Sequence, residues 1–272
     1  MLTFPNAKIN IGLNVTERRP DGYHNLETVF YPIALCDILE VVPSSKNADY
    51  SFHASGIAID GDADNNLITK AFRLLKNNFD IPPIEVFFQK IIPFGAGLGG
   101  GSADASFMLK MLNEMFDLQL STMQLENYAA RLGADCPFFI RNQAVFASGT
   151  GNVFQDINLF LKGYYIALVK PDVYVSTKDA YAGITAQKPQ YDLRETIENR
   201  PVSEWKNIVV NDFETTVFQK FPVIEKIKNE LYAQGALYAA MSGSGTAVFG
   251  IFDYASDVKA LFPDYFVWEH VL

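Results

Sequence analysis

A glycine-rich run ahead of a helix-forming segment constrains this chain more than any other feature. Residues 93–105 read Pro-Phe-Gly-Ala-Gly-Leu-Gly-Gly-Gly-Ser-Ala-Asp-Ala. Without side chains, a backbone can approach a ligand closely and adopt positive φ at little cost. Helix-compatible residues follow from Ser102 to Phe116, and the first amides of a helix favour negative charge. The run therefore predicts a phosphate-binding loop at a helix N-terminus.

Other nucleotide-binding motifs fit this loop poorly. A dinucleotide site needs a strand directly before G-x-G-x-x-G and an acidic residue after the next strand, whereas Pro93 interrupts the approach and Asp117 follows a helix. A Walker P-loop needs Lys before Ser or Thr after the last glycine, and Ser102 stands there instead. The H-R-D and D-F-G triplets of protein kinases do not occur. A bare turn remains the alternative, although it rarely needs so many glycines.

The composition fits a folded chain with no long-range attraction to polyanions. The 272 residues are 49% hydrophobic and 19% charged, so a sizeable core can form. The net charge of −9 predicts no binding to nucleic acid or to an anionic membrane. We find no basic leader, no apolar stretch long enough for a membrane span, and no metal-ligand spacing at Cys36 or Cys136. A cytoplasmic protein with reduced thiols is expected.

Hydrophobic periodicity predicts an irregular alternation of strands and helices, and so an α+β fold. Strands are expected over residues 7–15, 30–42, 84–88, 164–169 and 246–252. Helices are expected over residues 64–79, 102–116, 121–132 and 223–234, the first capped by Asp64 or Asn65 and the third by a capping box of Ser121 and Gln124. Residues 188–206 are expected to form an exposed connection. We expect one domain over residues 1–155 and a second over residues 156–272.

Charged and amide residues elsewhere could complete a site around the loop. Lys8 and Asn10 share one face of an apolar strand, where a cation and an amide suit an anionic or hydroxyl-bearing ligand. A solvated strand lysine is the alternative. Asp135 lies in a tight exit from a helix and could accept a hydroxyl proton. Sequence spacing does not show whether Lys8 and Asp135 meet.

A second small-residue loop and an aromatic turn add to this set. Gly243, Ser244 and Gly245 are expected between a helix and an apolar strand, where their amides could close over phosphates. Tyr23 and His24 follow a turn and could stack on and hydrogen-bond a heterocycle. Tight connections without a ligand are the alternative for both segments.

In this order the motifs resemble those of the GHMP kinase superfamily of small-molecule kinases, over nearly the whole chain. The matching segments are residues 7–10, 19–24, 93–103, 132–138 and 242–246. Kinases of mevalonate, homoserine and galactose share the glycine loop but lack the Tyr23 and His24 pair. The resemblance implies a two-domain GHMP kinase fold. Its N-terminal domain would be like domain 2 of ribosomal protein S5, and its C-terminal domain would be ferredoxin-like.

The resemblance also implies an activity and a set of site residues. The activity is ATP-dependent phosphorylation of the 2-hydroxyl on the methylerythritol part of a CDP-linked substrate, in isoprenoid precursor biosynthesis, with Mg²⁺ accompanying ATP near Ser102. Lys8 and Asp135 would be catalytic. ATP would be bound by Asn66, Lys90, Pro93, Phe94, Gly95, Ala96, Gly97, Leu98, Gly99, Gly100, Gly101, Ser102 and Ala103. The substrate would be bound by Asn10, Tyr23, His24, Phe30, Thr177 and Tyr181, and the phosphates closed over by Gly243, Ser244 and Gly245.

Two parts of the sequence depart from the family pattern or lack a counterpart in it. Ala96 stands where relatives often have glycine, and residues 187–206 have no firm correspondence. Another small alcohol, such as mevalonate or homoserine, is an alternative substrate. A non-catalytic nucleotide-binding module is a further alternative, against which the presence of both Lys8 and Asp135 argues. The sequence predicts no dedicated metal cage and gives no oligomeric state.

Overall fold

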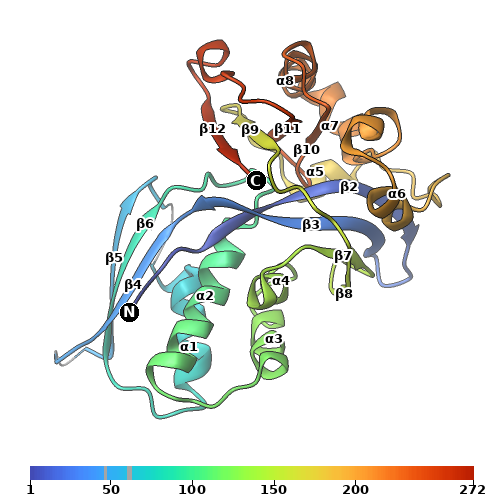
Figure 1. Cartoon of the computed structure of the whole chain (residues 1–272). Helices are drawn as coiled ribbons and strands as arrows, with labels where there is room; N and C mark the ends of the chain where they lie inside the picture. Colours follow the sequence, from blue (N-terminus) through green and yellow to red (C-terminus); the bar gives the residue numbers. More distant parts are fainter. Residues whose placement is uncertain (46–47, 60–62) are drawn as a thin grey trace. The chain divides into compact units, whose positions relative to one another are not determined.

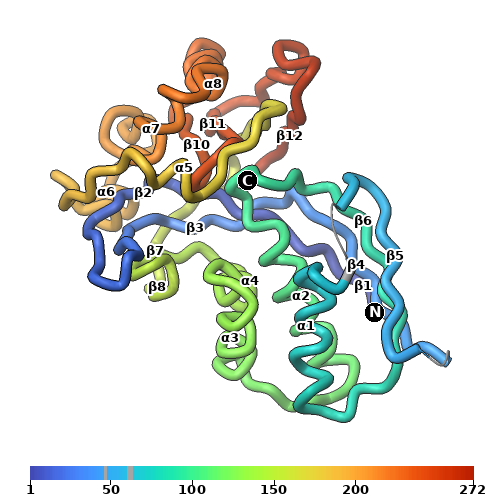
Figure 2. Tube along the Cα trace, turned by 180° about the vertical axis from the view of Figure 1, so that it is seen from behind, coloured from blue at the N-terminus to red at the C-terminus, as the bar shows by residue number. Residues whose placement is uncertain are grey.

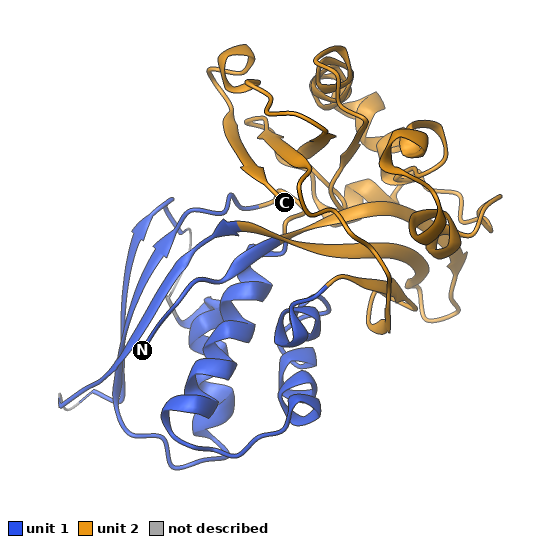
Figure 3. Ribbon diagram, viewed as in Figure 1, with its two compact units in different colours: residues 1–7, 35–94, 99–143 blue, residues 8–34, 95–98, 144–272 orange. Residues whose placement is uncertain are grey.

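The structure is a computed structural model that describes residues 1–45, 48–59 and 63–272. The described residues divide into two compact units (Figure 3). Unit 1 comprises Met1–Ala7, Leu35–Phe94 and Gly99–Gln143, and unit 2 comprises Lys8–Ala34, Gly95–Leu98 and Ala144–Leu272. The glycine-rich run therefore contributes to both units. The domain boundary expected between residues 155 and 156 stays a prediction.

Unit 1 packs helices against a sheet of order β1-β4-β6-β5. Its strands are β1 (Leu2–Thr3), β4 (Ile38–Pro43), β5 (Tyr50–Gly56) and β6 (Ile84–Lys90), and β5 pairs with β6 in parallel. Helix α1 (Leu67–Lys76) lies beside α2 (Gly100–Met115), and α3 (Thr122–Ala130) lies beside α4 (Cys136–Arg141) (Figures 1 and 2). Alternate strand residues such as Ile84 and Val86 pack with Met108 and Leu112 of α2, so the methionine-bearing face of this helix is part of the core.

Unit 2 contains an antiparallel sheet of order β10-β11-β9-β12, with β9 (Tyr165–Lys170), β10 (Tyr238–Met241), β11 (Val248–Phe252) and β12 (Phe266–Val271). Helix α8 (Pro222–Ala233) packs on β10 and β11, and α7 (Phe213–Lys220) packs on α8 and on α5 (Thr177–Tyr181). A further sheet has the order β2-β3-β7-β8. In unit 2 it comprises the parts of β2 (Asn6–Arg18) and β3 (His24–Cys36) that fall within residues 8–34, together with β7 (Val145–Ser148) and β8 (Val153–Asp156). The α+β prediction is confirmed.

Some element boundaries differ from the prediction. The first helix begins at Leu67, because the Asn66 side chain accepts a hydrogen bond from the Ile68 amide at 2.8 Å. Asp64 and Asn65 instead belong to a 3₁₀ helix over Ala63–Asn65. The strand expected over residues 30–42 is two strands, β3 and β4, separated at Asp37. The capping box of Ser121 and Gln124 is confirmed.

The exposed connection expected over residues 188–206 is wrong. Helix α6 (Leu193–Asn199) and a 3₁₀ helix over Val202–Asn207 occupy most of it, and Leu193 and Trp205 are buried. Asp192 caps α6 by accepting a hydrogen bond from the Glu195 amide at 2.8 Å. Both helices are too short for a hydrophobic period to stand out in the sequence. Among the helices in the described ranges, none has the length and apolar character needed to cross a membrane.

Candidate active site

The glycine-rich run leads into α2 through left-handed backbone. Gly97 and Gly99 have φ of 72° and 69°, a conformation that side chains disfavour. Helix α2 begins at Gly100, before the predicted Ser102, with Gly99 as its N-cap. Within the part of the chain that the structure describes, no side chain caps this end, so the first amides of α2 keep their hydrogen-bonding capacity for a ligand. This is the geometry of an anion site at a helix N-terminus.

The second small-residue loop is bonded directly to the glycine run within unit 2. The Thr246 and Ala247 amides donate to the carbonyl oxygens of Gly95 at 3.1 Å and Ala96 at 3.2 Å. The Ser242 hydroxyl donates to the Gly97 carbonyl at 2.9 Å. Residues 242–246 connect β10 to β11, not a helix to a strand as predicted, because the short strand β10 stands between α8 and the loop. The two loops form one backbone surface.

Lys8 is buried against this surface. Its side chain is 4% exposed, and its Nζ donates to Asn10 Oδ1 at 2.6 Å and to the Gly97 carbonyl at 3.1 Å. The ammonium also lies 4.9 Å from the centre of the Phe30 ring. Asn10 is held in turn, since its Nδ2 donates to Thr28 Oγ1 at 3.0 Å. A solvated lysine is therefore excluded, and predicted residues from three chain segments are brought together.

Asp135 is the N-cap residue of α4 and is half-buried. It belongs to unit 1, whereas Lys8 belongs to unit 2. Each residue is placed within its own unit, and the pairing of the two side chains stays a prediction.

The predicted heterocycle clamp is partly assembled in unit 2. The His24 and Tyr181 rings stack with centroids 4.9 Å apart and an interplanar angle of 22°. Tyr181 packs edge-on against Phe213 at 4.7 Å. Tyr23 is 68% exposed, so its ring is accessible to a ligand. Thr177 is the first residue of α5, the helix that carries Tyr181.

A pocket of about 290 Å³ in unit 1 gathers several residues predicted to bind ATP. Its lining comprises Ile59, Asn65, Asn66, Leu67, Phe88, Lys90, Phe94, Gly101 and Asp104. Most of them come from the start of α1, the end of β6 and the first turns of α2, so the pocket lies beside the uncapped helix end. An apolar pocket with a few polar groups is typical of a small-molecule site.

Sequence reasoning missed two carboxylates beside this pocket. Lys90 is 2% exposed, and its Nζ donates to Asp37 Oδ2 at 2.5 Å and to Asp104 Oδ2 at 3.0 Å. Asp37 Oδ1 also accepts hydrogen bonds from the Ile91 and Ile92 amides, at 2.5 and 2.8 Å. Asp37 therefore fixes the backbone where β6 ends and the loop begins. The signal available in the sequence was the charged Asp37 in the middle of the strand predicted over residues 30–42.

The same cluster holds one ammonium between two carboxylates. Burial raises the pKa of Asp104 well above its usual range, and Lys90 offsets this in part. Asp104 Oδ1 is buried and accepts no hydrogen bond from any residue that the structure describes. We conclude that Asp104 is the carboxyl group of the cluster whose ionised form is least compensated.

Comparisons with known proteins agree with the resemblance in the motifs. Residues 66–148 match the family described as GHMP kinases N terminal domain, and residues 193–263 match GHMP kinases C terminal. The 4-diphosphocytidyl-2-C-methyl-D-erythritol kinase of Bacteroides fragilis is 59% identical over 93% of this chain and 92% of its own length. The kinase of the same name from Parabacteroides distasonis is 55% identical over 99% of this chain and 98% of its own length. The crystal structure of a 4-(cytidine 5'-diphospho)-2C-methyl-D-erythritol kinase is 29% identical and superposes with a TM-score of 0.82, covering 99% of this chain and 98% of that one.

Proposed function

The chain belongs to the GHMP kinase family, among its 4-diphosphocytidyl-2-C-methyl-D-erythritol kinases, and we propose that it transfers the γ-phosphoryl group of ATP to the 2-hydroxyl of that CDP-linked alcohol. It is a small-molecule kinase with ATP as co-substrate. The observation that carries the proposal is Lys8, whose buried ammonium bonds both Asn10 and the glycine-run carbonyl of Gly97. A mevalonate or homoserine kinase is not favoured, because the relatives of high identity are named for the CDP-linked substrate.

Unit 1 supplies most of the groups that would hold ATP, and Gly95–Leu98 of unit 2 supply the rest. The uncapped first turn of α2 offers amides to the β- and γ-phosphates, which the helix dipole also favours. The pocket lined by Asn66, Lys90 and Phe94 would take the adenosine end. Phosphoryl transfer requires mainly positioning and charge stabilisation, and fixed backbone amides provide both.

Mg²⁺ is proposed to accompany ATP. Among the described residues, no three His, Cys, Asp or Glu side chains lie together as a metal site. Mg²⁺ does not need such a cluster, because it keeps several waters and binds through substrate phosphates with few protein ligands. Ser102, in the first turn of α2, is the residue proposed to hold it. When bound, the ion would neutralise charge on the phosphates.

Two charged residues would act at the reacting hydroxyl of the substrate. Asp135 would accept the proton of the attacking hydroxyl, as a general base must. Lys8, fixed by its two hydrogen bonds, would stabilise the developing negative charge. Asn10 and Thr177 would contact the substrate near this end. His24 and Tyr181, already stacked, would hold the cytosine with Tyr23 closing over it.

The substrate is tested by ADP release in the presence of ATP and Mg²⁺. We expect turnover with the CDP-methylerythritol compound and background release with mevalonate or homoserine. Equal release with all three alcohols would contradict the proposed specificity.

The role of Asp135 is tested by Asp135→Asn, which keeps the size of the side chain and removes the base. General-base catalysis contributes roughly 10²- to 10⁴-fold, so kcat should fall by about that factor while KM for ATP changes little. Steady-state kinetics measure both values. Asp253→Asn, at an exposed position, is the matched control and should retain full turnover. Near-normal kcat in Asp135→Asn would exclude this residue as the base.

A further inference from the structure

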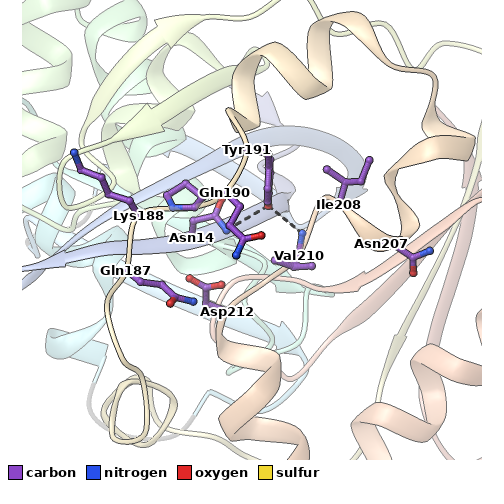
Figure 4. Close-up of a pocket in the computed structure, with 10 residues that line it drawn as sticks. Asn14, Gln187, Lys188, Gln190, Tyr191, Asn207, Ile208, Val210 and Asp212 are labelled. Atoms are coloured by element: carbon purple, nitrogen blue, oxygen red, sulfur yellow. Dashed lines mark hydrogen bonds between the residues drawn. The ribbon is translucent and has the colours of Figure 1, made fainter.

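A pocket in unit 2 lies apart from the residues assigned above. Its volume is about 470 Å³, and it is lined by Asn14, Gln187, Lys188, Pro189, Gln190, Tyr191, Asn207, Ile208, Val210 and Asp212. Figure 4 shows these residues on β2, on residues 187–191 and on residues 207–212, with Tyr191 hydrogen-bonded to Asn14 and Val210 at the centre. None of them is a predicted site residue.

The pocket is built on a fixed frame along the edge of β2. The Leu13 amide donates to the Val210 carbonyl at 2.8 Å, and the Asp212 amide donates to the Leu13 carbonyl at 2.8 Å. The Gln187 amide donates to the Val15 carbonyl at 3.0 Å. Both loops that form the walls are therefore tied to one strand, and the polar groups at the base are held in place before a ligand arrives.

The buried side chain of Asn14 holds the Tyr191 hydroxyl in place. Its side chain is 3% exposed, and its Nδ2 donates to Tyr191 Oη at 3.3 Å (Figure 4). Burial raises the pKa of Asp212, and hydrogen bonding from the Val15 amide and from Asn14 lowers it in part. Asn14 Oδ1 is buried and accepts no hydrogen bond from any described residue, which is costly for a polar atom.

Tyr191 and Asp212 add a donor and an acceptor. Tyr191 Oη accepts hydrogen bonds from Asn14 Nδ2 and from the Val210 amide, each at 3.3 Å, so its hydrogen is left to donate. Burial raises the pKa of Tyr191, which keeps the hydroxyl protonated. Asp212 Oδ2 accepts from the Val15 amide at 2.7 Å, and a carboxylate has further lone pairs to offer.

We propose that this pocket binds a neutral, hydroxyl-rich ligand, a polyol or a sugar. A hydroxyl both donates and accepts, so adjacent hydroxyls can accept from Tyr191 and donate to Asp212 together. A phosphate or carboxylate would face the Asp212 carboxylate, and an ammonium would meet Lys188, which also lines the pocket. A nucleobase needs an aromatic face, whereas Tyr191 presents its hydroxyl end (Figure 4).

The experiment is an NMR titration of the full chain with erythritol and with ribose, following the Val210 amide and the Asn14 side-chain amide. We expect saturable shifts with both polyols and none with succinate, an anion of similar size. Tyr191→Phe should weaken binding about threefold to tenfold, the effect of one lost hydrogen bond. Tyr232→Phe is the matched control, because the Tyr232 hydroxyl donates to the Ala239 carbonyl elsewhere in unit 2, and its binding should equal that of the wild type.

Repeating the titration with saturating CDP-methylerythritol compound and no ATP distinguishes two sources of the hydroxyls. Loss of the erythritol shifts, with a raised KM for that compound in Tyr191→Phe, assigns the pocket to hydroxyls of the kinase substrate. Shifts that persist assign it to a separate polyol. Wild-type protein without saturable shifts, or equal affinity in Tyr191→Phe, overturns the proposal. If Tyr191→Phe does not fold, Asp212→Asn takes its place in both comparisons. Because binding is read without catalysis, its failure would leave the proposed kinase activity unaffected.

Discussion

At the scale of single residues, the buried cluster of Lys90, Asp37 and Asp104 contains two acidic groups and only one basic group. One ammonium serves two carboxylates, and Asp37 also accepts two amides, so the excess charge falls on Asp104. Leaving a buried charge without full compensation is costly. The cost appears only when Asp104 is ionised, which makes it depend on pH.

We predict that Asp104→Asn removes a pH-dependent loss of stability. In the unfolded chain the carboxyl titrates near 3.8, whereas burial raises its pKa in the folded protein. Between these two values the folded state binds more protons, so the free energy of unfolding falls as pH rises through that interval. Relative to the wild type, Asp104→Asn should therefore gain stability as pH rises. Urea unfolding at several pH values measures the difference, with Asp253→Asn as the exposed control. A difference that stays constant with pH would contradict this account.

The residue pattern of a single strand predicted the Lys8 and Asn10 pair, but it did not predict the carboxylate partners of Lys90. Lys8 and Asn10 alternate on one strand, and the period of two that places them on one face also allows their 2.6 Å hydrogen bond. Asp37 and Lys90 are 53 positions apart, and only the pairing of β4 with β6 brings their region together. No local spacing encodes such a contact. The identity of a buried counter-ion therefore could not be read from the sequence.

At the scale of elements, the glycine run is fixed by its contact with the loop between β10 and β11. A Cβ at Gly97 would lie 1.9 Å from the Ser242 carbonyl oxygen, and the residue has φ of 72°. A Cβ at Gly101, in the first turn of α2, would lie 3.6 Å from Leu67 Cδ1, an ordinary contact. The two glycines thus have different reasons to be glycine.

We predict that Gly97→Ala displaces the glycine run while Gly101→Ala leaves the fold intact. Two backbone segments must separate to admit the methyl group of Gly97→Ala, which breaks the loop-to-loop hydrogen bonds and strains the left-handed residue. The free energy of unfolding should fall by about 1–3 kcal/mol, and ATP binding should weaken strongly. Gly101→Ala should unfold like the wild type. Thermal unfolding and nucleotide titration measure both effects, and equal behaviour of the two variants would contradict the assignment.

Long, strongly periodic elements were predictable and short ones were not. Helix α2 and the capped α3 follow from glycine, serine and a methionine stripe. Strand β10 is short, so the second loop was expected after a helix. Helix α6 lies in polar sequence. Its Leu193 side chain packs so closely on β2 that a Cβ added to Gly12 would contact it, and this packing fixes the position of the helix. Tertiary packing decides such elements, and a single sequence does not show it.

At the scale of the whole molecule, an acidic protein is proposed to bind two anionic substrates. The net charge of −9 opposes their approach, so affinity must come from local groups. Those groups are distributed between the units. The first turn of α2 and the adenosine pocket belong to unit 1, and the stacked pair of His24 and Tyr181 belongs to unit 2. Each substrate should therefore protect a different set of residues.

We predict that hydrogen exchange separates the two substrates by unit. A non-hydrolysable ATP analogue should slow amide exchange at residues 99–103 and around Asn66, because it would cover the uncapped helix end and the pocket of unit 1. CDP without ATP should slow exchange at residues 23–30 and 177–181 in unit 2. Ligand at about 100 times its dissociation constant stabilises a protein by about 2.7 kcal/mol, which is enough to detect. Protection of residues 177–181 by the ATP analogue alone, with none at residues 99–103, would reverse the assignment of the two halves. Inorganic phosphate, which shares only the anionic groups, should protect residues 99–103 and leave the Asn66 region unchanged, because that region depends on contacts with the nucleoside.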